Sequence, residues 1–374
     1  MKATDPFVSI IVLNFDGKEW LKECLASLEK LHYPKDRYEV IMGDNGSTDG
    51  SGEYVAQNFS WVRIFRFRKN YGFCKANNLC ARGAKGDYLV FLNNDTFVEK
   101  DWLRFLVEEA RSGPNILSCA SKMFFPQYKR GHLVQTAGGV IVPSGCGLYE
   151  GWMEEDSEAY NVPRDTGFGC AAGVLIERQF FLETGGFDEY YFYSGEEADL
   201  GFRVWAYGYK VRYVPTAVMY HFMGRTGFRG KGVTPTIENL ILRNSLYFIL
   251  KNFEWVNVLK GILLYEARVV AKILYALAKG NFPILAAILK AHATLLKDRG
   301  KVLRVRREMQ QKRRVTDKEL RQKGVLISVP EFIRRNYRLV KNLKRYQTGD
   351  FYDTKDTVRV KVDEEGDWVF EKVQ

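Results

Sequence analysis

The stretch "DYLVFLNNDTFV", residues 87–98, changes from apolar to polar within one position. Leu89 to Leu92 form an apolar run typical of a buried strand, and Asn93, Asn94 and Asp95 follow directly. In open sheets of parallel strands, ligands bind beyond the carboxyl ends of the strands. The polar triplet therefore lies where a binding site is expected, provided that the neighbouring segments form such a sheet.

The segments before this stretch alternate between strand and helix patterns. Strands are predicted at 7–13, at 61–67 and in a segment that runs into a turn at 38–47; helices are predicted at 18–31, after Asp49 and at 73–84. Such alternation is typical of βαβ units, so we expect an α/β protein with a mostly parallel central sheet flanked by helices. Polar residues follow three of the strands, at 14–16, 44–49 and 93–95.

The rest of the chain predicts two further parts. Residues 129–165, rich in glycine and aromatic residues, are interpreted as sheet extensions and surface loops. A strand at 171–176, a helix at about 196–207 and one or two short strands ending at His221 complete a first domain of residues 1–232. C-terminal helices at 233–300 follow, and residues 301–374 form a basic segment and a tail whose alternation suits a β-hairpin around Glu364–Asp367.

Composition narrows the class of protein. The chain has 374 residues, a net charge of +11 and 46% hydrophobic residues, which indicates a folded protein that favours anionic partners. Its six cysteines form no C-x-x-C pair, which argues against a zinc site or a disulfide framework and suits a reducing cytosol. The apolar run at 7–13 is too short for a secretory signal.

Asp95 and His221 are candidate metal ligands. A carboxylate after two amides at a strand end can hold Mg²⁺ or Mn²⁺ together with substrate phosphates. The alternative for Asp95 is a simple turn with Thr96. His221 also ends a strand; it is either a further ligand or a structural histidine.

Two other polar groups have structural alternatives. Asp44 in "GDNGSTDGS" (43–51) could bind a nucleobase or ribose, or the segment could only form a turn and a helix cap. In "YSGEEADLGFRVW" (193–205), Ser194 and Glu197 fit a capping box, and Asp199 and Arg203 fit an i,i+4 pair. The first helical turn nevertheless holds more carboxylates than a cap needs, so one of them could act as a general base.

The order of these groups resembles glycosyltransferase family 2, which has a GT-A fold. Successive family blocks resemble "VSIIVLNFDGKEWLKECLASL", "EVIMGDNGSTDGS", "NYGFCKANNLCARGAKGDYLVFLNNDT" and "CAAGVLIERQFFLETGGFDEYYFYSGEEADLGFRVWAYGYKVRYVP". The later "ILRNSLYFILKNF" is similar to a segment of the rhamnosyltransferase-like branch, so the resemblance covers residues 7–253. P-loop, G-x-G-x-x-G, G-x-S-x-G and H-E-x-x-H motifs are absent.

The resemblance implies roles for individual residues. Asp95 stands at the D-x-D-type metal position with His221 as an extra ligand, and Glu197 stands at the catalytic-base position with Glu196 as its rival. The nucleotide-sugar site it implies comprises Asn14, Asp16, Asp44, Asn45, Asn70, Lys75 and Asn94. The acceptor-binding residues it implies are Asp199, Arg203 and Trp205.

The implied activity is inverting, metal-dependent transfer of one sugar from dTDP-rhamnose or a UDP-sugar to a hydroxyl group. The acceptor would be a glycan or a lipid-linked molecule of cell-surface polysaccharide synthesis. No Q-x-x-R-W signature of processive synthases occurs. The alternative is a catalytically inactive GT-A scaffold, because the triplet has one aspartate and the base position carries glutamate. A nucleotidyltransferase would need a G-x-G-T-R-type loop, and nucleic-acid binding would need aromatic residues within 297–314; both are absent.

The C-terminal helices carry a narrow polar stripe, which consists of Asn257, Gly261, Arg268, Lys272 and Lys279. The remaining apolar face and the basic segment at 297–314 fit an anionic membrane surface, which would make the protein cytoplasmic and peripheral on the inner face of the cell membrane. The alternative is that the apolar face packs on the catalytic domain and the basic run is a solvated helix.

Overall fold

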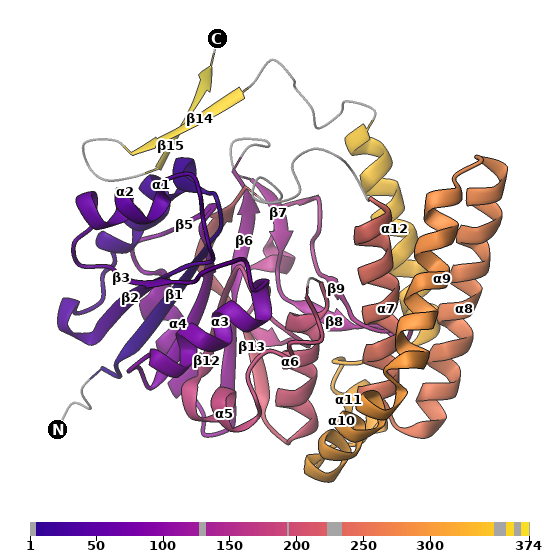
Figure 1. The fold of residues 1–374 in the computed structure, drawn as a ribbon. Coiled ribbons are helices and arrows are strands. Elements are labelled where there is room, and N and C mark those ends of the chain that lie inside the picture. The colour runs from indigo at the N-terminus through magenta and orange to yellow at the C-terminus, as the bar shows by residue number, and fades with distance from the viewer. Residues whose placement is uncertain are drawn as a thin grey trace.

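The computed structural model describes residues 5–126, 132–192, 194–222, 234–347, 357–362 and 368–373. A large twisted sheet with helices on its faces fills one side of the molecule, and a bundle of long helices stands beside it (Figure 1). The sheet with its helices and the helical bundle are thus neighbouring regions of one chain (Figure 1).

The centre of the sheet is parallel, as predicted. β1 (Val8–Asn14) lies between β2 (Tyr38–Asp44) and β4 (Tyr88–Asn93), and β3 (Arg63–Arg66) pairs with the outer side of β2. In this register Asn14 lies opposite Asp44, and Leu13 opposite Asn93. The polar ends of three strands therefore meet at one edge of the sheet.

Helices cover these strands because each has one apolar face. They are α1 (Lys18–Glu29), α2 (Ser51–Asn58) and α3 (Phe73–Gly83). α1 buries Leu21, Cys24, Leu25 and Leu28, the face that the spacing predicts.

Beyond β4 the sheet becomes mixed. β12 (Gly173–Glu177) is antiparallel to β4 and to β6 (Ile116–Phe125), and β13 (Lys210–His221) runs parallel to β6. The end of β13 also pairs with the short β5 (Thr96–Val98), where His221 lies opposite Thr96. This pairing brings His221 next to the polar triplet.

Among the described residues, the remaining elements of this part of the chain are three α-helices and five short strands. Helices α4 (Trp102–Arg111), α5 (Arg178–Glu183) and α6 (Glu196–Ala206) lie in this part of the chain. The segment interpreted as sheet extensions and surface loops is more ordered than that. It holds β7 (Leu133–Thr136), β8 (Gly139–Ile141), β9 (Gly147–Tyr149), β10 (Glu154–Glu155) and β11 (Arg164–Asp165). All residues of β7 and β8 are buried, so the expectation of surface loops is wrong there.

The C-terminal part is helical as predicted. Its helices are α7 (Pro235–Asn252), α8 (Trp255–Ala278), α9 (Phe282–Lys297), α10 (Arg299–Lys312), α11 (Asp317–Gln322) and α12 (Val329–Gln347). α7 contacts α6 on one side and α8, α9 and α10 on the other. Among the described residues, no helix combines the length and the apolar character needed to cross a bilayer.

The predicted β-hairpin of the tail is present as two antiparallel strands, β14 (Thr357–Val362) and β15 (Trp368–Val373). Its expected turn at Glu364–Asp367 lies outside the described residues. The basic segment is not simply solvated, because Arg306 on α10 is buried and donates hydrogen bonds to the carbonyl groups of Leu250 and Phe253.

Candidate active site

Amide side chains connect the strand ends at the edge of the sheet. Asn94 Nδ2 donates a hydrogen bond to Asn14 Oδ1 (2.6 Å), and Asn14 Nδ2 donates to Ser47 Oγ (3.1 Å). Asn14 and Asn94 are both buried, so their amide groups depend on each other for hydrogen bonds. The ends of β1 and β4 and the loop after β2 are thereby fixed relative to one another.

Asp44 and Asp16 shape the same loop. Asp44 Oδ1 accepts a hydrogen bond from the backbone N–H of Ser47 (3.1 Å), and Asp16 Oδ1 accepts one from that of Thr48 (2.7 Å). Neither carboxylate lines the cavity described below. The turn that the sequence offered as an alternative for Asp44 is therefore present.

Asn45 and Asn70 form a second amide pair. Asn45 Nδ2 donates to Asn70 Oδ1 (3.0 Å), and Asn45 Oδ1 accepts from the backbone N–H of Tyr71 (2.8 Å). The pair precedes α3, whose N-cap residue Gly72 has a φ of +78° that favours glycine. Lys75, one turn into α3, is exposed and lies with its Nζ 5.1 Å from the centre of the Tyr71 ring, outside the cavity lining.

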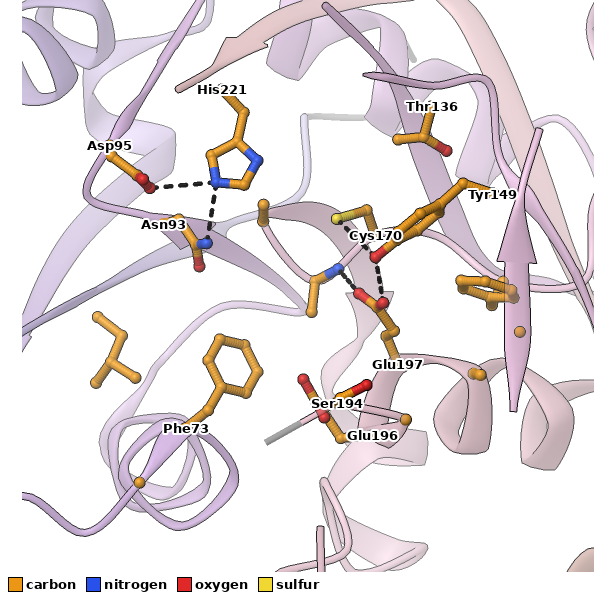
Figure 2. A pocket seen from close by; sticks show the side chains of 18 of the residues that line it. Phe73, Asn93, Asp95, Thr136, Tyr149, Cys170, Ser194, Glu196, Glu197 and His221 are labelled. Atoms are coloured by element: carbon orange, nitrogen blue, oxygen red, sulfur yellow. Dashed lines mark hydrogen bonds and ion pairs between the residues drawn. The ribbon is translucent and has the colours of Figure 1, made fainter. Parts of the chain in front are cut away.

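These elements enclose a cavity of about 520 Å³. Asp95 and His221 lie on one side of it and Glu196 and Glu197 on another (Figure 2). Seven of the residues predicted for the site line it: Asn45, Asn70, Asn94, Asp95, Glu196, Glu197 and His221. The structure therefore brings residues from the ends of β2, β4 and β13 and from the start of α6 to one cavity.

Asp95 and His221 form a pair suited to a cation. His221 Nε2 lies 3.2 Å from Asp95 Oδ1, and Asn93 Nδ2 lies 3.3 Å from the same nitrogen. On the other side of the ring, His221 Nδ1 lies 3.1 Å from Gln135 Oε1. A histidine with its proton on Nδ1 donates a hydrogen bond to this oxygen. Nε2 then presents a lone pair beside the Asp95 carboxylate.

Burial strengthens this arrangement. Asp95 is 2% exposed, and among the described residues none donates a hydrogen bond to its Oδ1. A buried carboxylate oxygen without a donor costs free energy, and a divalent cation would remove that cost. Mg²⁺ and Mn²⁺ commonly take one or two protein ligands and complete their shell with phosphate and water. Within the described ranges, no group of three or more His, Cys, Asp and Glu side chains is arranged to hold a metal.

Glu197 is held by hydrogen-bond donors. Its Oε2 accepts from the backbone N–H of Ala171 (2.7 Å), and its Oε1 accepts from the hydroxyl of Tyr149. The predicted capping box is wrong, because Gly195 is the N-cap of α6 and no side chain caps the helix. Ser194 and Gly195 both have positive φ angles, 69° and 99°, and this bent backbone directs the first turn of α6 into the cavity.

Glu196 lies beside Glu197 without such donors. Its side chain is 8% exposed, and its Oε2 has no hydrogen-bond partner among the described residues. Burial, with the neighbouring Glu197 carboxylate, raises the pKa of Glu196 to about 8. Burial also raises the pKa of Glu197, against the hydrogen bonds from Tyr149 and Ala171 that favour its anion. At neutral pH the pair therefore holds a proton on Glu196, and Glu197 is the carboxylate equipped to be ionised.

The three residues predicted to bind the acceptor lie elsewhere. Asp199 is fully buried and accepts hydrogen bonds from Arg203 Nε (2.9 Å) and Lys251 Nζ (2.9 Å). Trp205 is buried and donates from Nε1 to the carbonyl oxygen of Thr166 (2.8 Å). None of the three lines the cavity, so the structure does not bring them to the acceptor side of the site.

Other residues of the site were not predicted. Gln135 orients His221 from β7, Tyr149 on β9 contacts Glu197, and Trp152 stacks on Tyr149 with ring centres 5.9 Å apart. All three come from the glycine-rich segment interpreted as surface loops. The high aromatic content of this segment was the one sequence signal that it contributes to a site, because aromatic rings often line ligand pockets.

Comparisons with known proteins agree with this geometry. Residues 9–183 match the family model described as Glycosyl transferase family 2. The chain is 32% identical over 223 residues to the O-antigen biosynthesis protein RfbC of Myxococcus xanthus, covering 55% of this chain and 16% of that protein. It is 27% identical over 243 residues to N-acetylglucosaminyl-diphospho-decaprenol L-rhamnosyltransferase of Mycobacterium tuberculosis, covering 58% of this chain and 77% of that protein. The chain spans well under half the length of several curated relatives that it matches.

Solved structures share the fold. A mannosyltransferase of Pyrobaculum calidifontis in complex with GDP-Man and Mn²⁺ aligns with a TM-score of 0.50 and 17% identity, over 83% of this chain and 86% of that one. GalNAc-T7 with UDP, GalNAc and Mn²⁺ aligns with a TM-score of 0.51 and 19% identity, over 67% and 51%. The predicted GT-A fold is thereby confirmed, as is the resemblance to family 2 and its rhamnosyltransferase-like branch.

Proposed function

We propose that the protein, whose residues 9–183 match the model of glycosyl transferase family 2, is an inverting glycosyltransferase that depends on a divalent metal. It transfers one sugar from a nucleotide-sugar, dTDP-rhamnose or a UDP-sugar, to a hydroxyl group of a glycan or lipid-linked acceptor. The observation that carries the proposal is that one cavity has the Asp95–His221 pair, suited to a cation, on one side and the Glu196–Glu197 carboxylate pair on the other.

The donor end of the cavity is proposed at the strand ends. Asn45, Asn70 and Asn94 line it and offer hydrogen bonds to the nucleotide or sugar, while Asn14, Asp16 and Asp44 fix the loops around them. Lys75 on α3, exposed and outside the cavity lining, is proposed to contact a donor phosphate through another rotamer. Mg²⁺ or Mn²⁺, held by Asp95 and His221, would neutralise the charge that develops on the leaving diphosphate.

The acceptor end is proposed at α6. Glu197 would accept the proton of the acceptor hydroxyl as that oxygen attacks the anomeric carbon and the nucleoside diphosphate departs from the opposite face. A single displacement of this kind inverts the anomeric centre, and the scheme contains no covalent intermediate. The Ala171 N–H and the Tyr149 hydroxyl hold the carboxylate in place, and each of its oxygens keeps a second lone pair for the acceptor.

Asp199, Arg203 and Trp205 are proposed to position the acceptor side from within the core. Their hydrogen bonds fix α6 against α7 and against the strand region at Thr166. The likeness to a rhamnosyltransferase and to an O-antigen biosynthesis protein supports an acceptor in cell-surface polysaccharide synthesis and a cytoplasmic, peripheral location at the membrane.

The test is release of nucleoside diphosphate from a panel of nucleotide-sugars in the presence of Mn²⁺ and a cell-envelope lipid extract. Wild type should release one diphosphate, and Glu197→Gln should lower the rate by about 10²- to 10⁴-fold. Binding of nucleotide and metal without any transfer would instead support the inactive scaffold.

A further inference from the structure

We propose that the outer face of α8 and α9 is a docking surface for an anionic membrane. The proposal rests on the exposure and charge of these two helices and does not depend on the proposed sugar transfer. Both helices lie at the side of the molecule away from the sheet (Figure 1).

α8 buries one face against the protein and exposes a second, apolar face, unlike a surface helix of a globular protein, whose exposed face is polar. The buried face combines Val258, Tyr265 and Val269 with part of the polar stripe. Asn257 is 8% exposed and donates from Nδ2 to Asp317 Oδ2 (2.7 Å), and Lys272 Nζ lies 2.8 Å from Glu238 Oε1 on α7. Its apolar stripe turns outward with six large side chains between 53% and 72% exposed: Val256, Leu259, Leu263, Val270, Leu274 and Leu277. Successive members of that stripe are three, four or seven residues apart, so they form one continuous face.

α9 repeats the pattern. Phe282, Leu289 and Leu296, each seven residues after the last, are 69%, 71% and 68% exposed. Its opposite face, with Ala287, Ile288, Ala291 and Leu295, is buried. Because α7 contacts both helices, the exposed stripes lie on the side turned away from α7. Such a large exposed apolar surface on a soluble fold marks an interaction site.

The charges around this face indicate that its partner is anionic. Residues 255–297 contain six basic side chains and a single acidic one, Glu266, whose Oε1 lies 3.2 Å from His292 Nε2. Lys260, Lys290 and Lys297 are exposed on the two helices, and α10 continues with Arg299, Lys301 and Arg304. Two copies of so basic a surface repel each other, whereas anionic lipid headgroups attract it. Exposed apolar side chains and basic residues together supply the two signals that stable attachment to a bilayer needs.

The docking surface is connected to the candidate active site through α7. Asn244 Nδ2 on α7 donates to the carbonyl oxygen of Ser194 (2.7 Å), next to the turn that places Glu196 and Glu197. Lys251 near the end of α7 contacts Asp188 (2.7 Å) and Asp199 (2.9 Å). On the proposed function, a protein attached through α8 and α9 would hold its acceptor side close to the membrane, which favours an acceptor carried by a lipid.

The experiment is flotation of the full chain with vesicles of phosphatidylcholine alone or with about a third phosphatidylglycerol. The variant Leu263→Gln/Leu289→Gln changes one largely exposed apolar side chain on each of α8 and α9. Its matched control, Trp61→Gln/Val162→Gln, changes exposed apolar residues of the catalytic part. Lys290→Gln/Lys297→Gln tests the charge, with Lys30→Gln/Lys323→Gln as its control at exposed lysines elsewhere.

We expect wild type and both controls to float with the anionic vesicles. The leucine variant should bind about tenfold more weakly or worse, and the lysine variant should lose the preference for phosphatidylglycerol and the sensitivity to salt. The proposal is overturned if wild type floats with neither kind of vesicle. It is also overturned by a wild-type dimer that the leucine variant converts to monomer, because that result assigns the face to a second copy.

The same preparations separate this proposal from the proposed function. Stabilisation by a nucleotide with Mn²⁺ in all variants, without flotation of wild type, rejects only the docking surface. Flotation of wild type without any response to nucleotides rejects only the glycosyltransferase assignment.

Discussion

At the scale of single residues, the account depends first on Asp95. Its buried Oδ1 lies 3.2 Å from His221 Nε2, an arrangement that a cation stabilises. Asp95→Asn removes the charge and should lower the affinity for Mn²⁺ in the presence of nucleotide by about a hundredfold. Isothermal titration calorimetry measures this, with Asp36→Asn, at an exposed carboxylate, as the control. An unchanged Mn²⁺ affinity would show that the pair has a structural role only.

Gln135 offers a second test of the same centre. Its Oε1 lies 3.1 Å from His221 Nδ1, so it favours the tautomer that carries its proton on Nδ1 and leaves a lone pair on Nε2. Gln135→Leu should weaken Mn²⁺ binding by about 10- to 100-fold, the range measured for groups that orient metal-binding histidines. Gln135→Glu keeps an acceptor at this position and should retain binding. Equal loss in both variants would point to general damage at β7 instead.

The carboxylate pair predicts a pH dependence of stability. The pKa of Glu196 is about 8 in the folded protein against an ordinary value of 4.5. Between these values the folded state holds a proton that the unfolded state has released, so the free energy of unfolding falls as the pH rises, by roughly 1 kcal/mol per unit. In Glu196→Gln the free energy of unfolding should fall less between pH 4.5 and 8 than in wild type. Urea denaturation at several pH values measures this difference. Parallel curves for variant and wild type would contradict the burial argument.

At the scale of elements, the buried charges between α6 and α7 hold the acceptor side together. Lys251 is 3% exposed and contacts both Asp188 and Asp199. Removing one partner of a buried ion pair leaves a charge unpaired, so Lys251→Met should lower the free energy of unfolding by about 3–5 kcal/mol. Lys210→Met, at a pair with the lysine 43% exposed, should cost less than about 1 kcal/mol. Similar losses of stability in the two variants would refute the conclusion that the buried ion pairs of Lys251 hold α6 against α7.

Elements also mark how far the sequence could predict the structure. The alternation of strands and helices before Asp95 predicted β1 to β4 and their helices, because period and polarity are local properties. The polar stripe of α8 was equally visible, but the side that it turns to the protein depends on Glu238 and Asp317, which lie 34 and 60 residues along the chain from their partners Lys272 and Asn257. The same limit hid Gln135 and Tyr149, whose partners are 86 and 48 residues distant.

At the scale of the whole molecule, one sheet edge gathers the chemistry and one helical bundle borders it. The predicted boundaries at residues 232 and 300 stay predictions, because α7 packs on α6 as well as on the later helices. The predicted site residues divide by position. Asn45, Asn70 and Asn94 meet the metal and carboxylate candidates in the cavity, because topology brings the strand ends and the start of α6 together. Asn14, Asp16 and Asp44 lie at or after the ends of β1 and β2 but outside the cavity lining, and Asp199, Arg203 and Trp205 are buried within α6.

The central claim, a metal-dependent nucleotide-sugar site, is tested most directly by thermal unfolding with UDP, dTDP, GDP and CMP, each with and without Mn²⁺. A ligand at 100 times its dissociation constant adds about 2.7 kcal/mol to the free energy of unfolding, which is readily seen as a rise in Tm. The account predicts that one nucleotide stabilises wild type only with Mn²⁺ and does not stabilise Asp95→Asn. Equal stabilisation of wild type and Asp95→Asn, or no response to any nucleotide by folded protein, would contradict it.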